Sequence, residues 1–440
     1  MKTVLTSVLL LLVGLLSTTV AKAQVIAGGI GHSLAICADG TVRSWGDNDE
    51  GQLGNGANMN TNLPVQVSGL TSVTSVAAGR FHSLALRTDG TVWSWGGNLY
   101  GQLGDGSNTA SNVPVQVASL SGITAIAAGW YHAIALKDDG TVWTWGHNAE
   151  GQLGNGTNTH SNDPVQVLPL TGITAIAGGS YYHSLALKDD GTFWGWGYNF
   201  YGQLANGGNA NTNVPVQAVA LAGISALAMG GHSSFAVLND GTVRSWGYNE
   251  FGELGDGTIT NSNVPVPVGA LSGIIAIAGG SESEVALADD GTVWAWGRNF
   301  YGEFGDGTTT ESHVPVHVTA FTGSTAVAAG QSHSLVLKND GTLRGCGRNF
   351  EGQLGIGTNV DSNVPVQVSG LCAVLGIEED RTEAASLAVY PNPTSGTTTV
   401  SWVRTAGSSE LAIRDVLGRE VHRSVPSGIL DVIDPTHSPA

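Results

Sequence analysis

The sequence has few charged residues, few cysteines and no apolar run long enough to cross a bilayer. Only 12% of its 440 residues are charged, against about 25% in ordinary domains. Surface helices need a charged face, and glycine, present 64 times, is poorly tolerated inside helices. Lys and Arg total 17 against 35 Asp and Glu, a net charge of -18, which argues against nucleic acid or an anionic membrane as partner. What remains is a turn-rich, mostly β protein.

The first 23 residues have the features of a targeting segment. Lys2 gives a positive start, residues 8–16 are apolar except for Gly14, and residues 21–23 (Ala-Lys-Ala) place small side chains where a signal peptidase reads them. We expect cleavage before Gln24. A retained anchor is the alternative, but this apolar core is far shorter than the ~20 residues of a membrane span. No later segment is apolar enough to span a membrane.

A unit of about 50 residues recurs seven times. The pair Asp-Gly stands at the same place in each unit, beginning at Asp39, Asp89, Asp139, Asp190, Asp240, Asp290 and Asp340. A fixed period means that one supersecondary unit is repeated. Alternating runs on either side of Asp-Gly, such as residues 82–86 and 92–96, predict a hairpin, since this dipeptide accepts positive φ angles. One further short run on each side of the hairpin gives four strands, which is typical of a propeller blade.

The seven units predict an all-β fold, a closed seven-bladed β-propeller over residues 24–376. An open stack would expose apolar terminal repeats that carry no polar cap. Unit one lacks the Gly-Leu-x-x-Val stretch that unit two has at residues 69–73, and residues 370–374 supply a match after the last unit. We therefore expect residues 370–374 to pair with unit one and close the ring.

Two of the three cysteines lie in the segments expected to pair. Cys37 ends a strand of unit one, and Cys372 lies in the segment that should lie beside it. The exported environment is oxidising, so the two are disulfide candidates, although spacing alone does not decide bridge geometry. Cys346 stands where the other units have Trp, and we expect it to be a buried thiol.

The repeated unit resembles a known family. It reads Ala-Ala-Gly-x-x-His-Ser-Leu-Ala-Leu, then Asp-Gly-Thr-Val-x-x-Trp-Gly-x-Asn-x-x-Gly-Gln-Leu-Gly, then Val-Pro-Val-Gln-Val. This is similar to the repeat of the regulator of chromosome condensation family over residues 24–376; kelch propellers share the period but are the weaker match. The resemblance implies seven blades. It does not fix the function, because the superfamily includes a nuclear nucleotide-exchange factor, eukaryotic signalling proteins and secreted bacterial β-lactamase inhibitors.

Some residues recur in every or nearly every unit and are of types that can bind metals or ligands. We interpret them as structural. One His per blade around a ring does not converge on a metal ion, so a hydrogen-bonded His at a strand start is favoured. The large repeated Trp side chains are expected to pack between blades. Gly-Gln-Leu-Gly lacks the Lys and Ser/Thr of a P-loop, and residues 47–50 form only a fragment of a calcium loop. The His positions are His32, His82, His132, His183 and His333, with Ser233 and Ser283 in the other units; the Trp positions are Trp45, Trp95, Trp145, Trp196, Trp246 and Trp296.

We therefore expect no metal site, no cofactor and no catalytic residues. An enzyme has no positive support, since nucleophile, base and orienting group do not occur together in a recognisable local motif.

The C-terminal region lacks the repeat. Residues 377–388 carry four acids, as a solvated linker would, and two alternating runs within residues 389–440 predict a small β-sandwich-like domain. Tyr-Pro-Asn-Pro at 390–393 and Asp-Val-Leu-Gly-Arg-Glu-Val at 415–421 resemble the sorting domain of type IX secretion substrates, which implies export to the surface or medium. The final Gly-x-Tyr-type strand of that family does not follow before Ala440, so the domain looks incomplete and a periplasmic location is the alternative.

Two loops of the unit vary most between repeats: the turn after Ala-Ala-Gly and the loop after Trp-Gly. Because antiparallel strands alternate in direction, both should emerge on one face, opposite the Asp-Gly turns. Their aromatic side chains can anchor a partner or stack on sugars, and packing onto neighbouring loops is the alternative. The candidate binding residues are Arg80, Phe81, Tyr100, Trp130, Tyr131, Tyr181, Tyr182, Phe200, Tyr201, Phe251, Phe300, Tyr301 and Phe350.

We interpret the chain as an exported, monomeric, non-enzymatic module that binds a protein or glycan. The alternatives are a secreted enzyme inhibitor of the β-lactamase-inhibitor type, a secreted enzyme, and a guanine-nucleotide exchange factor. The last is implied by the family name alone, and the targeting segment and the acidic composition argue against it.

Overall fold

The computed structural model describes residues 24–179 and 181–375, together with the backbone of five short strands further on. The expected targeting segment, residues 1–23, and most of the expected acidic linker lie outside the described residues. The chain divides into two compact units, Met1–Gly376 and Ile377–Ala440. No helix in the described part of the chain is long and apolar enough to cross a membrane.

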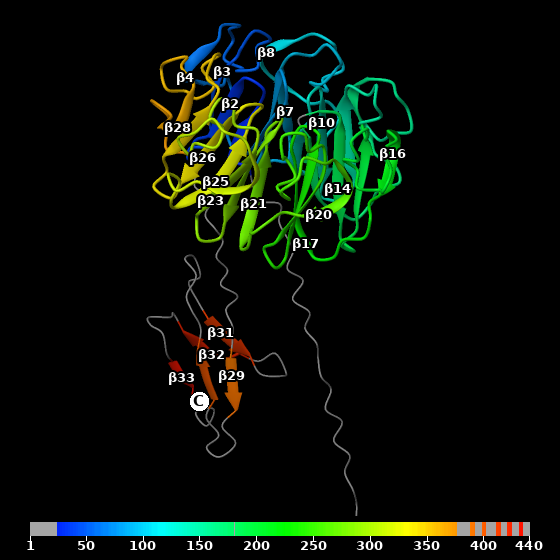
Figure 1. Cartoon of the computed structure of the whole chain (residues 1–440). Coiled ribbons are helices and arrows are strands. Elements are labelled where there is room, and N and C mark those ends of the chain that lie inside the picture. The colour runs from blue at the N-terminus through cyan, green and yellow to red at the C-terminus, as the bar shows by residue number, and fades with distance from the viewer. Residues whose placement is uncertain are drawn as a thin grey trace, which may run out of the picture. The chain divides into compact units, whose positions relative to one another are not determined.

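The first unit contains seven four-stranded antiparallel sheets, the blades, in which sequence order is also spatial order (Figure 1). Blade 1 has β1 (Ile26–Gly28), β2 (His32–Ile36), β3 (Val42–Gly46) and β4 (Thr61–Gln66). Blade 2 has β5 (Val73–Ala78), β6 (His82–Arg87), β7 (Val92–Gly96) and β8 (Ser111–Gln116). Blade 3 has β9 (Ile123–Ala128), β10 (His132–Lys137), β11 (Val142–Gly146) and β12 (Ser161–Gln166). Blade 4 has β13 (Ile173–Gly178), β14 (His183–Lys188), β15 (Phe193–Gly197) and β16 (Thr212–Gln217).

Blade 5 has β17 (Ile224–Met229), β18 (Ser233–Leu238), β19 (Val243–Gly247) and β20 (Ser262–Pro267). Blade 6 has β21 (Ile274–Gly279), β22 (Ser283–Ala288), β23 (Val293–Gly297) and β24 (Ser312–His317). Blade 7 has β25 (Ser324–Ala329), β26 (His333–Lys338), β27 (Leu343–Gly347) and β28 (Ser362–Gln367). The first strand of each blade contacts the first strands of its two neighbours, β1 and β25 included, so these strands surround the axis. The predicted seven-bladed β-propeller is confirmed.

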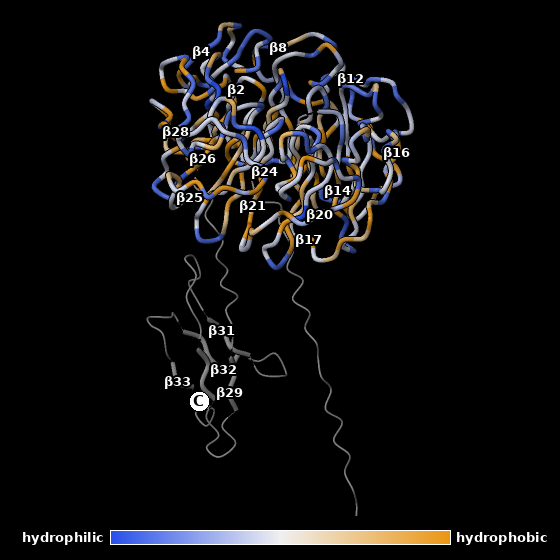
Figure 2. The backbone as a smooth tube through the Cα atoms, viewed as in Figure 1, coloured by the Kyte–Doolittle hydropathy of each residue, from blue (hydrophilic) through white to orange (hydrophobic). Residues whose placement is uncertain are grey.

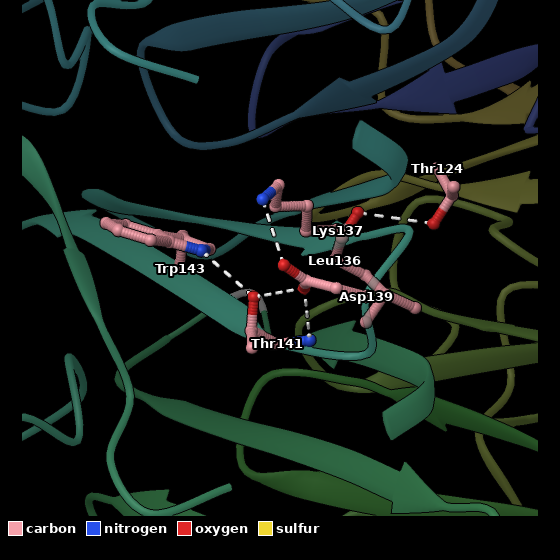
Figure 3. Close-up of polar contacts among 6 residues, drawn as sticks. All are labelled: Thr124, Leu136, Lys137, Asp139, Thr141 and Trp143. Carbon is pink, nitrogen blue, oxygen red and sulfur yellow. Dashed lines mark hydrogen bonds and ion pairs between the residues drawn. The ribbon is translucent and has the colours of Figure 1, made fainter. Parts of the chain in front are cut away.

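The Asp-Gly turns form the predicted hairpins, with a difference in detail. In blade 3 the Asp139 carboxylate accepts hydrogen bonds from the Thr141 backbone N–H (3.0 Å) and hydroxyl (2.6 Å), and the Trp143 indole donates to that hydroxyl (Figure 3). Only the glycine has a positive φ, 76° at Gly140. Since Lys137 N–H bonds the Thr141 carbonyl, the loop has three residues with a terminal glycine rather than two left-handed residues.

The two ends of the repeat region close the ring in blade 1. β1 has only three residues, and Val374 pairs with Cys37 beyond its end. Ala38 N–H donates to the Ala373 carbonyl at 2.8 Å, as Thr88 N–H donates to Ser72 in blade 2. The expected pairing of residues 370–374 with unit one is therefore confirmed. In the structure Cys37 and Cys372 form a disulfide with their Cα atoms 5.7 Å apart.

Large apolar side chains fill the spaces between blades, as predicted. Trp95 of blade 2 is fully buried beside Val42 and Val67 of blade 1, and its indole donates to the Gln52 carbonyl of blade 1 at 2.8 Å. A Cβ on Gly54 would lie 2.7 Å from the Trp95 ring, which explains a glycine there. Cys346, in the Trp position of blade 7, is a buried free thiol that donates to the Glu303 carbonyl. Figure 2 shows hydrophobic segments recurring through all blades.

The repeated His side chains join neighbouring blades, and the predicted hydrogen bonds are confirmed in four of five cases. The Nε2 atoms lie 2.9–3.1 Å from Ser hydroxyls in the pairs His32–Ser83, His132–Ser184, His183–Ser234 and His333–Ser33. Each Ser hydroxyl also donates to a backbone carbonyl of the blade that carries the His, so His Nε2 must be the donor to Ser. For His82 the prediction is wrong: neither ring nitrogen has a partner, because Ala133 stands where Ser is required.

In the second unit, the described residues form a sheet of β29 (Ala388–Pro391), β30 (Thr398–Ser401) and β33 (Asp431–Ile433), and a hairpin of β31 (Leu411–Arg414) and β32 (Glu420–Ser424). β30 and β31 cover the first four residues of the two alternating runs expected near residues 398–403 and 411–416. Residues 392–397 and 415–419, which carry much of the sorting-domain resemblance, lie outside the described residues.

Candidate binding face

The two variable loops of each blade lie together on one face of the propeller, here called the loop face. Backbone hydrogen bonds join them within a blade: Gly97 N–H donates to the Phe81 carbonyl at 2.7 Å, and His147 N–H to the Tyr131 carbonyl at 2.8 Å. The residues that differ most between repeats are thereby presented side by side.

A buried asparagine organises the loop after Trp-Gly. Asn98 Oδ1 accepts from Leu103 N–H, and its amide donates to the carbonyls of Ser107 and Thr109. The Gln102 side chain accepts from Tyr100 N–H at 2.9 Å. Other blades repeat this arrangement, so the loops are rigid supports for variable side chains. The signal for the asparagine was present in the sequence, since it recurs three residues after the packing Trp or Cys346 in all seven units.

Aromatic side chains form a continuous network on this face from blade 2 to blade 5, here called the aromatic cluster. Ring centroids lie 5.1 Å apart in Tyr100–Tyr131 and 4.2 Å apart in Trp130–Tyr181. Tyr181 stacks on His232 at 4.2 Å. The cluster comprises Phe81, Tyr100, Trp130, Tyr131, His147, His160, Tyr181, Tyr182, Tyr198, Phe200, Tyr201, His232 and Tyr248.

The residues selected from the sequence fall into two groups. Nine lie in or against the cluster, with Arg80 stacked over Trp130. The other four surround two arginines: Phe251, Phe300 and Tyr301 lie about Arg298, and Phe350 lies under Arg348. Phe200, Phe300 and Phe350 are 62%, 52% and 72% exposed. The remaining candidates are half-buried by packing against one another.

Five members of the cluster were not selected from the sequence: His147, His160, Tyr198, His232 and Tyr248. Three of them directly follow Trp-Gly, at a position where the seven units have Asp, Gly, His, Tyr twice and Arg twice. That variation between otherwise regular repeats was the available signal.

The cluster histidines are neutral at physiological pH. Burial, with His160 nearby, lowers the pKa of His147 to about 4, and burial lowers the pKa of His232 to about 4. His147 Nδ1 lies 2.6 Å from the Gln152 amide, which can only donate there because its oxygen accepts from Glu150 N–H. The cluster therefore offers apolar ring surface with N–H and O–H groups, and Arg80 brings a positive charge to it.

Blades 5 and 6 carry buried acids where other blades are neutral. Glu253 and Glu303 stand at the position of Gln102, and burial raises their pKa values to about 8 and about 7. Glu284 stands at the position of the bonding Ser, and burial raises its pKa well above the ordinary value. Among the described residues, no three His, Cys, Asp or Glu side chains are grouped to hold a metal ion.

Comparisons with known proteins agree with this architecture. Residues 11–291 match the family model described as RCC1-like domain, and residues 290–337 and 340–377 match the regulator of chromosome condensation (RCC1) repeat. No curated protein matches the sequence.

Several solved structures are similar. Human WBSCR16 shares 26% identity at a TM-score of 0.67, with 75% of this chain and 94% of that chain covered. Yeast RCC1 (Prp20), solved bound to Kap60, shares 21% identity at 0.69, with 87% and 88% covered. Prp20p from Saccharomyces cerevisiae, reported with its binding to Gsp1p and histones, shares 22% at 0.66, with 84% and 88% covered. The yeast structures support the fold alone. Because the RCC1-like model spans more than half of the sequence, the chain belongs to the RCC1-like β-propeller family.

Proposed function

We propose that this chain is an exported, non-enzymatic binding protein that holds a protein or glycan on its loop face. RCC1-like propellers commonly mediate protein binding. The observation that carries the proposal is the aromatic cluster, which gathers 13 rings from four consecutive blades. Rings that already pack on one another lose little conformational freedom when a partner arrives, so they make efficient anchors.

The aromatic side chains that pack between the blades are not those of the loop face. Six fully buried Trp side chains already fill the spaces between blades. The cluster rings instead remain partly accessible, with Phe200 the most exposed of the cluster's large apolar side chains, and the exposed Phe300 and Phe350 add apolar surface on the same face. An exposed apolar surface of this kind on a monomer is characteristic of an interaction site.

Export is the second part of the proposal. It is supported by the composition of residues 1–23 and by the resemblance of residues 390–421 to a type IX sorting domain. The Cys37–Cys372 disulfide fits an oxidising compartment. Inhibition of a secreted enzyme is one form that binding through this face can take.

Capture from the native medium tests the binding face. The mature chain is crosslinked to its partner in parallel with the triple variant Trp130→Ala, Tyr131→Ala, Tyr201→Ala, and both are applied to a glycan array. We expect the variant to lose capture. The control is Asp138→Asn with Asp189→Asn, two exposed acids on the opposite Asp-Gly face, and circular dichroism shows whether each variant is folded. If the triple variant still captures the partner, or if the control variant loses it, the partner does not bind through the aromatic cluster of the loop face.

A further inference from the structure

Arg80 differs from the other arginines of the loop face in having no acidic partner. Arg298 pairs with Glu282, and Arg348 pairs with Glu351 at 2.7 Å. The Arg80 side chain makes no hydrogen bond or ion pair with any residue in the described ranges, and its buried Nε has no partner. Arg43, Arg244, Lys338 and Arg344 also make no ion pair in the described ranges, but these four lie in strands and not in the two variable loops.

The guanidinium of Arg80 is nevertheless held in place. Its central carbon lies 4.5 Å from the centroid of Trp130, 4.7 Å from that of Phe81 and 5.6 Å from that of Tyr131. The backbone is fixed as well, since Arg80 N–H donates to the Trp130 carbonyl at 3.0 Å. A planar fork of donors is thus fixed before binding, in surroundings where aromatic rings displace water and strengthen its attraction for an anion.

Arg80 borders a small pocket on the propeller axis. Arg80 and Trp130 line one part of it, and Ser281 and Gln331 line another. Ile30, Ala78 and three glycines complete the lining. No acidic side chain lines this pocket. The Gln331 amide makes no side-chain hydrogen bond within the described part of the chain, so a second free donor lines the same pocket as Arg80.

We propose that Arg80 is the recognition site for a carboxylate side chain, Asp or Glu, of a protein partner. The inference rests on the proposed function and narrows its partner to a protein. A bidentate pair between the guanidinium and a carboxylate uses the free terminal N–H groups, and the Gln331 amide can donate to the same carboxylate. Such an arginine among aromatic residues has the composition of an interface hot spot.

A side-chain carboxylate fits this place better than an acidic sugar. Sugars stack on the open face of an aromatic ring, but Arg80 already lies over Trp130. Trp130 also meets Tyr181 edge-on, at an interplanar angle of 70°. The pocket beside these rings is small, and glycine backbone forms part of its lining, so a carboxylate group suits it better than the larger ring of a sugar.

The test measures binding of three probes to the mature chain by calorimetry: N-acetyl-Glu-Phe-amide, its Gln counterpart and glucuronic acid. We expect the Glu peptide to bind at least tenfold more tightly than the Gln peptide. Arg80→Gln should remove this difference and Arg80→Lys should retain part of it, because Lys keeps the charge without the planar fork. Arg87→Gln, which removes a charge on the opposite Asp-Gly side, is the matched control.

Equal binding of the two peptides, or an unchanged preference in Arg80→Gln, overturns the inference. Binding of glucuronic acid in place of the Glu peptide overturns the choice of a protein partner. If the Trp130, Tyr131, Tyr201 triple variant loses the native partner while Arg80→Gln retains it, the binding face stands and the carboxylate site fails. If neither change affects capture, both proposals fail.

Discussion

The Ser233 hydroxyl donates a hydrogen bond to Oε1 of Glu284 at 2.8 Å, across the boundary between blades 5 and 6. Four other boundaries are joined at the same place by a His that donates to a Ser. Here Ser replaces the His as the donor and Glu replaces the Ser as the acceptor, so the hydrogen bond keeps its direction. The substitution buries a carboxyl group whose other oxygen has no partner among the described residues. Because burial raises the pKa of Glu284 well above its ordinary value, this boundary contains a titratable acid where the other four contain a Ser hydroxyl.

The stability of the propeller should fall as the pH rises from 6.5 to 8.5. Burial raises the folded-state pKa of Glu253 to about 8 and that of Glu303 to about 7, from an ordinary 4.5. The folded state thus holds protons that the unfolded state has already released, and raising the pH favours unfolding. Glu253 alone should cost about 2 kcal/mol over this interval. Urea unfolding at several pH values measures the effect.

The repeated histidines act in the opposite direction at lower pH. Burial, with His82 and His333 nearby, lowers the pKa of His32 to about 3, and burial lowers the pKa of His82 to about 4. Below pH 6.5 these histidines bind protons in the unfolded state but not in the folded state. The free energy of unfolding should therefore also fall towards pH 4. Glu253→Gln should lessen the fall above pH 6.5 and steepen the acid limb between pH 6.5 and 4.5, because its linkage effect spans the interval between the two pKa values. Asp189→Asn, at an exposed site on the Asp-Gly face, should leave the alkaline limb unchanged. A flat profile above pH 6.5 in the wild type contradicts the assignment.

Ala133→Ser should stabilise the protein. It supplies the hydroxyl that His82 lacks at the boundary between blades 2 and 3, and the Gln102 carbonyl, which accepts from Trp145, can accept from it. A net gain of about 0.5–1.5 kcal/mol is expected for one buried hydrogen bond. The reverse control, Ser83→Ala, leaves His32 without a partner and should cost about 1–3 kcal/mol. If both variants unfold at the wild-type urea midpoint, the His–Ser links do not contribute to stability.

The regular parts of this fold could be predicted because the same residue pattern occurs once in each of the seven repeats. The Asp-Gly hairpins, the Trp packing and the closure by residues 370–374 all follow from local patterns and a period. The unpaired His82 could not be predicted from its own unit, because its partner position lies one repeat later, at Ala133. The aromatic cluster was found only in part for the same reason: Tyr181 meets His232 across a blade boundary, and such contacts become visible only when repeats are aligned and offset by one.

If residues 390–421 form a sorting signal, deletion of residues 385–440 should leave a folded propeller in the periplasm. The propeller's described contacts end at Leu375, so the deletion spares its hydrogen bonds. Immunoblots of periplasm, cell surface and medium measure the distribution, with the full chain as control. Unchanged surface or medium levels contradict the sorting function, as does a full chain that never leaves the periplasm.

Closure of the ring through blade 1 can be tested by comparing two truncations. Deletion of residues 385–440 keeps Val374 paired with Cys37, whereas deletion of residues 369–440 removes that pairing and the disulfide and opens the edge of the first blade. The melting temperature should be unchanged in the first and markedly lower in the second. A bridge across 335 residues can contribute about 5 kcal/mol through the unfolded state, so Cys372→Ala should account for part of the loss. One free thiol, that of Cys346, should react in the denatured, unreduced mature protein; three reactive thiols would show that the two chain ends are not covalently joined.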